Sequence, residues 1–271
     1  MIFNDDQSSG TKPRSTNAFH SLFGTDAAAL RRICVLAPFS SREMLKGFKM
    51  ERCAGGALYS VGDNGLFSLV VTRMGAPFLG DAVLHLEHTP CEYLILFGSC
   101  GAVDGKGFEP GSLAVIETAY SQDSFVNMLF QRKCDSVYYP DEEFLRRFLS
   151  CQKEYPLKRA TCLTVGSLKL EEQYLSALQH DSTSTDHHDS TAHHDAIDVV
   201  DMETSAFYAA SGHTHKKALS FLLVTDILTK FPYYLAMGAE NRKLLRQFTA
   251  RASEILFELI THMAVSSQIP F

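Results

Sequence analysis

The sequence predicts an α/β fold, a three-layer sandwich with a mixed central β-sheet flanked by helices. Three observations support this prediction. Short apolar runs of strand length alternate along the chain with stretches of helical periodicity. One pair of runs is joined by turn residues typical of an antiparallel hairpin, whereas the others are separated by helical patterns, as parallel strands require. The chain has 271 residues, 45% of them hydrophobic, which is enough to bury a large core.

Individual elements follow from the same patterns. Four continuous apolar runs predict buried strands, at 31–37, 66–73, 92–98 and 112–118. Within 57–72, the sequence GDNG at 62–65 favours a hairpin, because Asn and Gly accept positive φ. Apolar residues at helical spacing predict helices at 77–87, 141–150, 240–263 and from Ala206 onward.

The chain is predicted to form one domain with a polar extension. Residues 1–27 are rich in Ser, Thr, Asn, Asp and Gly, so we expect either a mobile tail or an arm that orders against a neighbouring subunit. No later stretch has the composition of a linker, and 28–271 is therefore expected to fold as a single catalytic domain.

Composition and charge exclude several classes of protein. The formal net charge of -6 argues against nucleic acid as the main partner. No apolar run reaches the roughly 18 residues that span a bilayer, and the polar start of the chain lacks a signal-peptide core. We therefore expect a soluble, cytoplasmic protein with no nucleic-acid or membrane partner.

A His-rich segment and seven cysteines raise the question of metal binding and disulfides, and we predict neither. The segment 180–198 holds five of the 11 histidines in a Ser/Thr/Asp context with no apolar framework, which favours a solvated surface loop over a metal site. The seven cysteines are scattered and include no CxxC pair, so we interpret them as reduced thiols. No metal or organic cofactor is predicted.

Three segments place polar residues where apolar strands end. GSCGAV at 98–103 allows a tight turn whose backbone N–H groups, with the Ser99 hydroxyl, face an anion, or else a plain strand-ending turn. VVDMETSA at 199–206 carries Glu203 into the start of a helix, where an acid is also favoured by the helix dipole alone. Asp226 ends an apolar strand, either as a partly buried carboxyl group that holds a proton near neutral pH or as a cap for the next turn.

Taken together and in this order, these segments resemble the nucleoside phosphorylase and nucleosidase superfamily. The similarity is greatest to the hexameric bacterial-type purine nucleoside phosphorylases and covers about 28–265. GSCGAV is similar to the family's phosphate-site turn, and VVDMETSAFYAA at 199–210 is similar to its ribose-binding VEMEAAxxYxxA segment. LLVTDIL at 222–228 resembles its strand that ends in Ser-Asp, and RMGAP at 73–77 resembles its GMGxP turn.

The resemblance implies roles for residues around a nucleoside. Met74 and Met202 would lie against the ribose, and Glu203 would accept hydrogen bonds from its 2′- and 3′-hydroxyls. Asp226 would be the general acid, supported by Arg242. Cleavage of an N-glycosidic bond develops a cationic sugar and an anionic base, so a proton delivered to purine N7 stabilises the leaving group. Members with Asp at this position act on purines, and we therefore predict a purine nucleoside.

The resemblance also implies a phosphate site and an oligomer. Ser99 and Arg42 would bind inorganic phosphate as the co-substrate, and Arg52 would be donated by a neighbouring subunit. Arg73 stands where the family usually has Gly, so it would add a charge for phosphate, contact a 5′-phosphate of the substrate, or pair with a surface acid. We expect a homo-oligomer, from dimer to hexamer.

Two departures from the family pattern keep other functions open. Leu96 replaces an Arg two residues ahead of GSCG, which would weaken phosphate binding by about 1.5–3 kcal/mol. The base-stacking segment at 163–169 keeps none of the family's SADLF pattern. Phosphorolysis of a purine nucleoside is the predicted reaction. The alternatives are hydrolysis, as in methylthioadenosine/S-adenosylhomocysteine nucleosidases, and a non-catalytic nucleoside-binding protein.

Overall fold

A computed structural model describes residues 15–122, 124, 125, 129, 137–152, 155–167, 169, 197–228, 230 and 238–265. The strands are β1 (Ile33–Ala37), β2 (Ala54–Gly55), β3 (Ser60–Asp63), β4 (Ser68–Val71), β5 (Tyr93–Ala102), β6 (Leu113–Ser121), β7 (Val137–Tyr138), β8 (Leu157–Thr164), β9 (Val199–Asp201) and β10 (Lys217–Ile227). The helices are α1 (Ser15–Phe23), the 3-10 turn η1 (Ala27–Ala29), α2 (Arg42–Gly47), α3 (Ala76–His85), α5 (Glu142–Ser150), α7 (Thr204–His213) and α8 (Ala239–Val265). The predicted His-rich loop lies almost wholly outside the described residues.

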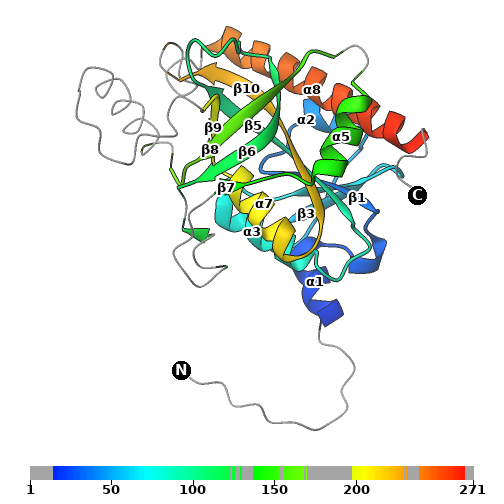
Figure 1. Ribbon diagram of the computed structural model, residues 1–271. Helices are drawn as coiled ribbons and strands as arrows, with labels where there is room; N and C mark the ends of the chain where they lie inside the picture. Colours follow the sequence, from blue (N-terminus) through cyan, green and yellow to red (C-terminus); the bar gives the residue numbers. More distant parts are fainter. Residues whose placement is uncertain are drawn as a thin grey trace, which may run out of the picture.

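The strands form one mixed sheet in the order β10-β6-β8-β9-β5-β1-β4-β3-β2, and β7 pairs with β6 outside this order. Figure 1 shows the sheet with helices around it. β10 also pairs with β5 in parallel, so β5, β10, β6, β8 and β9 close on themselves as a small barrel. β1 pairs in parallel with β5 and β4 and extends this barrel as an open sheet. The mixed sheet was predicted, whereas the closure was not.

The predicted hairpin is present. β3 and β4 are antiparallel, with Ser60 opposite Val71 and Asp63 opposite Ser68. The Asn64 side-chain oxygen accepts the N–H of Leu66 at 3.0 Å, and Gly65 has a φ of 86°. Positive φ at this glycine is the conformation that the sequence GDNG favours.

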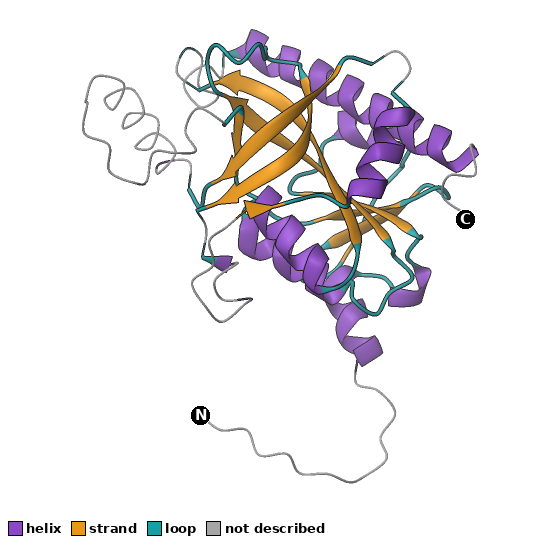
Figure 2. Ribbon diagram, in the orientation of Figure 1, coloured by secondary structure: helices purple, strands orange, loops and turns teal. Residues whose placement is uncertain are grey.

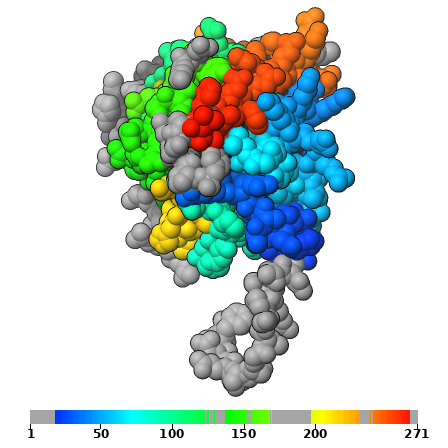
Figure 3. Space-filling view, turned by 90° about the vertical axis from the view of Figure 1, so that its right-hand side faces the viewer, coloured from blue at the N-terminus to red at the C-terminus, as the bar shows by residue number. Residues whose placement is uncertain are grey.

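Helices cover both faces of the sheet, as Figure 2 shows. Along β1, alternate side chains enter two core clusters: Cys34 and Leu36 pack with α1, α3 and α7, while Val35 packs with α2, α5 and α8. Figure 3 shows α8 next to the blue N-terminal part of the chain, consistent with the contact between α2 and α8. Strands that are buried on both faces read as continuous apolar runs, which confirms the three-layer prediction.

Part of the predicted N-terminal extension belongs to the folded domain. In α1, Phe19 and Phe23 are buried with their rings stacked at 4.2 Å, and Phe23 also packs on Tyr59 at 4.5 Å. A side chain at Gly24 would lie 2.6 Å from the carbonyl carbon of Gly55, so the two backbones pack in direct contact. The polar composition of 1–27 gave no indication that Phe19 and Phe23 would be buried. The prediction of a mobile tail over the whole of 1–27 is therefore wrong.

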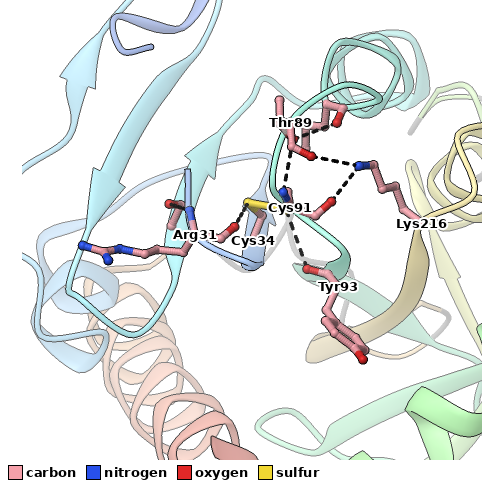
Figure 4. The surroundings of a disulfide bond; sticks show 8 residues. Arg31, Cys34, Thr89, Cys91, Tyr93 and Lys216 are labelled. Atoms are coloured by element: carbon pink, nitrogen blue, oxygen red, sulfur yellow. Dashed lines mark hydrogen bonds between the residues drawn. A yellow bond between two sulfur atoms is a disulfide. The ribbon is translucent and has the colours of Figure 1, made fainter. Parts of the chain in front are cut away.

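The prediction that all cysteines are reduced is also wrong. Cys34 in β1 and Cys91, which precedes β5, form a disulfide with their Cα atoms 6.1 Å apart (Figure 4). The Lys216 ammonium group donates to the carbonyl oxygen of Cys91 at 2.7 Å and fixes the same loop. The two cysteines are 57 residues apart in sequence, but β1, which holds Cys34, pairs with β5, which Cys91 precedes by two residues, so their proximity is a property of the sheet.

Breaking this disulfide is expected to destabilise the protein. Closing a loop of this length removes entropy from the unfolded chain worth about 4 kcal/mol. Cys91→Ser should therefore lower the melting temperature measured without reductant, whereas Cys53→Ser, at a half-buried free thiol, should have little effect. Peptide mapping of protein alkylated without reductant checks the bond directly. Full alkylation of both Cys34 and Cys91 would contradict it.

Among the described residues, no group of three or more His, Cys, Asp and Glu side chains is arranged to hold a metal ion. None of the described helices is long and apolar enough to cross a membrane.

Candidate functional site

The strand β5 carries the first of the predicted site segments, and it runs through that segment without a break. Gly98, Ser99 and Gly101 lie inside β5, which ends only at Ala102. The prediction of a tight turn at 98–103 is therefore wrong. Ser99 is partly exposed, whereas its neighbours Gly98 and Cys100 are buried. The glycines serve close packing here, not a turn conformation.

Gly101 is the point at which the three segments meet. It pairs with Asp226 of β10 on one side and with Val200 of β9 on the other. A Cβ atom at this position would lie 2.8 Å from Cγ of Leu228 and 3.4 Å from Oδ2 of Asp226. Only glycine leaves room for both side chains over β5.

Replacing Gly101 with alanine is expected to displace Leu228 and Asp226. The added methyl group overpacks the site, so we expect a loss of stability of about 1–3 kcal/mol together with reduced activity. Gly212→Ala, at a helical glycine with open space around its Cα, is the matched control and should leave both unchanged or raise stability slightly. Thermal unfolding and turnover measurements check this prediction. Unchanged values for Gly101→Ala would contradict the close approach.

A β-bulge in β10 aims Asp226 into this region. Val224 pairs with Cys100, and Asp226 pairs with the next residue, Gly101, so Thr225 is the extra residue of the bulge. The Thr225 hydroxyl lies 2.7 Å from Oδ1 of Asp226. Asp226 is buried and lies inside β10, one residue before the strand ends.

Glu203 is buried where β9 passes into α7. Its Oε1 accepts the N–H of Gly75 at 2.6 Å. Gly75 has a φ of 106° and precedes α3, so its N–H points at the carboxyl group from a conformation that favours glycine. One hydrogen bond thus joins the RMGAP and VVDMETSA segments, which are 128 residues apart in sequence.

The electrostatics of Glu203 favour its protonated form. Burial is the main cause that raises the pKa of this carboxyl group above its ordinary value, and the charge of nearby Asp201 raises it further. The backbone N–H groups of Gly75 and Met202 oppose this rise, because they donate to the carboxylate. Glu203 therefore favours its protonated form near neutral pH.

The two predicted methionines are neighbours in sequence of the residues that form this hydrogen bond. Met74 is 58% exposed and directly precedes Gly75, and Met202 is partly exposed and directly precedes Glu203. Both methionines therefore lie next to the bond between Glu203 and Gly75 along the chain.

The four predicted arginines all have exposed side chains. Arg42 begins α2, and Arg52 precedes the edge strand β2. The Arg73 guanidinium group lies over the Phe78 ring at 5.5 Å, next to Met74. Arg242 lies in the first turn of α8. Only Arg73 is thus next to another predicted site residue in sequence.

The environment of Leu96 shows that an arginine at this position would not be accommodated. It is completely buried in the apolar cluster shared by β1, β5 and β10. A guanidinium group at this position would be placed in the core without a partner, which costs several kcal/mol. Leu96→Arg is therefore expected to unfold the protein, and the arginine would not add a usable phosphate contact.

Several polar contacts of the site were not predicted. Asp201 and Thr204 belong to the segment 199–210, and Thr164 ends β8. The hydrogen bonds that join these three residues depend on the register of β8 beside β9, which the sequence does not show. The bulge at Thr225 likewise has no signal in the sequence. Of the predicted base-stacking segment at 163–169, residue 168 lies outside the described range.

The fold and this site define a class of α/β proteins with a partly closed mixed sheet and two buried carboxyl groups, Asp226 near the end of β10 and Glu203 at the start of α7. Residues 38–264 match the family model described as the phosphorylase superfamily. The chain belongs to this superfamily of nucleoside phosphorylases and nucleosidases, which are enzymes. The resemblance inferred from the motifs is thereby confirmed.

Solved structures support the same fold. Uridine phosphorylase from Vibrio fischeri ES114 is similar with a TM-score of 0.65 and 15% identity, over 86% of this chain and 93% of that one. The 5′-methylthioadenosine/S-adenosyl homocysteine nucleosidase of Campylobacter jejuni is similar with a TM-score of 0.61 and 14% identity, over 86% and 97%. A search of curated protein sequences found no match.

Proposed function

We propose that this enzyme cleaves the N-glycosidic bond of a purine nucleoside by phosphorolysis, releasing the free base and ribose 1-phosphate. The observation that carries the proposal is the position of Gly101 between Asp226 and the β9–α7 segment. The two neighbouring strands are about 10 Å apart across β5, twice the ordinary strand spacing. A nucleoside has the size to bridge the two carboxyl groups.

One carboxyl group acts on the ribose of the nucleoside and the other acts on its base. Glu203 accepts the ribose hydroxyls, with Met74 and Met202 against the sugar, and its carboxylate stabilises the positive charge that develops on the ring. Asp226 donates a proton to N7 of the base as the bond breaks. Thr225 orients Asp226, because its hydroxyl lies within hydrogen-bond distance of the carboxyl group.

Phosphate would bind beside Ser99, whose side chain is partly exposed. The exposed guanidinium groups of Arg42 and Arg73 supply charge without any contribution from position 96. Arg52 lies at the edge strand β2, a position from which we propose that it serves the site of a neighbouring subunit. Arg242, in the first turn of α8, would support Asp226.

Hydrolysis is the second candidate, and the burial of Leu96 favours it. Position 96 supplies no charge to a phosphate dianion, and water needs none. A purine nucleosidase would use the same roles for Glu203 and Asp226.

The experiment that tests the proposal identifies the sugar product. Adenosine, inosine, guanosine, methylthioadenosine and uridine are each incubated with the protein, with and without inorganic phosphate, and the products are identified by mass. Ribose 1-phosphate formed only with phosphate supports phosphorolysis. Free sugar at an unchanged rate without phosphate means hydrolysis, cleavage of uridine alone contradicts purine specificity, and no base release supports a binding role.

A further inference from the structure

The carboxyl group of Asp201 is surrounded by hydrogen-bond donors. It is buried at the end of β9. Oδ2 accepts the N–H of Thr204 at 2.8 Å and its hydroxyl at 2.5 Å. Oδ1 accepts the Thr164 hydroxyl at 2.7 Å and contacts the Cys162 thiol at 3.3 Å. Four donors on two oxygens fill the acceptor sites of an ionised carboxylate and leave little place for a proton of its own.

These bonds fix the turn that carries Glu203. The Thr204 N–H belongs to the first turn of α7, so Asp201 holds the start of that helix against the end of β9. The Thr164 hydroxyl also accepts the N–H of Ser205 at 2.9 Å and extends the network to β8. Glu203 lies between these anchored residues, and its side chain makes none of these bonds.

The carboxyl groups of Asp201 and Glu203 differ in how readily they hold a proton. Burial raises the pKa of both, but four donors oppose this rise at Asp201, whereas only two backbone N–H groups oppose it at Glu203. The other titratable groups facing Asp201 are the Cys162 thiol, which has Cys100 as a further neighbour, and the Tyr208 phenol. Burial raises the pKa of Cys162 and of Tyr208, so both stay neutral. The negative charge of the group therefore resides on Asp201.

We propose that Asp201 is a positioning residue that holds the turn bearing Glu203 in place and, through its negative charge, keeps a proton on Glu203 until a sugar binds. When ribose hydroxyls donate to Glu203, its proton passes to the buffer. Substrate affinity should then rise as the pH rises through the titration of Glu203. The effect on affinity rests on the proposed ribose-binding role of Glu203, whereas the proton assignment in the empty protein does not.

The first test uses the empty protein and needs no substrate. Carbon-13 NMR of labelled carboxyl groups is recorded from pH 5 to 9, with the Glu203 signal assigned by its loss in Glu203→Gln. We expect Glu203 to titrate well above the ordinary range of a glutamate while Asp201 stays ionised. Titration of Asp201 in place of Glu203, or an ordinary midpoint for Glu203, would overturn the proposal without any variant of Asp201 having to fold.

Two variants then separate charge from structure. Asp201→Asn keeps an oxygen for the Thr204 N–H but removes the charge, so the Glu203 midpoint should fall by about one pH unit. Asp198→Asn is the matched control, because Asp198 leads into the same strand and binds the Thr161 N–H at 2.8 Å. It should leave the midpoint unchanged. A shifted Glu203 midpoint in Asp198→Asn, or an unshifted midpoint in Asp201→Asn, would overturn the proposal that the charge of Asp201 keeps a proton on Glu203.

The kinetic readout distinguishes this proposal from the proposed function. With a cleaved nucleoside, KM of the unmodified enzyme should fall as the pH rises, and Asp201→Asn should lose most of that pH dependence, with a smaller effect on kcat. A KM that is equally pH-dependent in both proteins would overturn the coupling to substrate. If no nucleoside is cleaved but the NMR titrations are as expected, the proposed function fails while the assignment of the proton stands.

Discussion

Asp226→Asn is expected to reduce base release by about 10²–10⁴-fold, the usual contribution of a positioned general acid. Asparagine has nearly the same shape and still offers an oxygen to the Thr225 hydroxyl, so the bulge in β10 should persist. The amide cannot give up a proton to the base. Turnover should therefore fall while the affinity for a nucleoside stays within a few-fold, as measured by calorimetry in the absence of phosphate.

The control for this change is Asp26→Asn, the same substitution at a side chain that is 76% exposed. It should leave turnover unchanged. Undiminished cleavage by Asp226→Asn would remove Asp226 from the general-acid role and direct attention to another proton donor at the ends of β5 and β10. Loss of binding together with turnover would instead indicate that Asp226 mainly holds the base.

Glu203→Gln is expected to reduce turnover strongly and to make the protein more stable at high pH. Glutamine keeps an oxygen for the Gly75 N–H but cannot accept both ribose hydroxyls as a carboxylate does, and it adds no negative charge to oppose the developing cation. We expect a loss of about 10²-fold or more in kcat/KM. Such a trade-off between stability and activity is common at sites that bury a charge.

The sign of the stability change follows from the pKa of Glu203. Burial and the charge of Asp201 raise this pKa from 4.5 to about 8 in the folded protein. A group with a raised folded pKa contributes stability below pH 4.5, and this contribution is lost as the pH rises through about 8. The melting temperature of Glu203→Gln should thus exceed that of the unmodified protein at pH 9, with a smaller difference at pH 5. Glu87→Gln, at a half-exposed side chain, should show no such pH-dependent difference.

The sequence predicted the layers of the fold but not the closure of the sheet. Continuous apolar runs such as 33–37 and 93–97 are visible without a structure, because both faces of these strands are buried. Pairing between β10 and β5 is not visible, since it joins strands separated by more than 100 residues. The same limitation applies to the disulfide, whose two cysteines become neighbours only through the pairing of β1 with β5.

The candidate site was predicted as residue types but not as a geometry. Glu203 and Asp226 were singled out because acids follow apolar runs, and both are buried at strand ends. The glycines of GSCG were interpreted as turn residues, because a sequence does not distinguish a glycine that needs positive φ from one that needs room for a neighbour. Gly101 is of the second kind, since the space above it is filled by Leu228 and Asp226.

The unbroken course of β5 through Ser99 and Gly101 limits how the site can move. Side chains carried by loops must lose conformational freedom when a ligand arrives, and each ordered residue costs about 1–2 kcal/mol of entropy. Gly101 is held by a strand pair on each side of β5, Ser99 pairs with Leu223 of β10, and Asp226 pairs with Gly101. These three residues lose their conformational entropy when the protein folds. Their relative positions are therefore already fixed when a nucleoside binds.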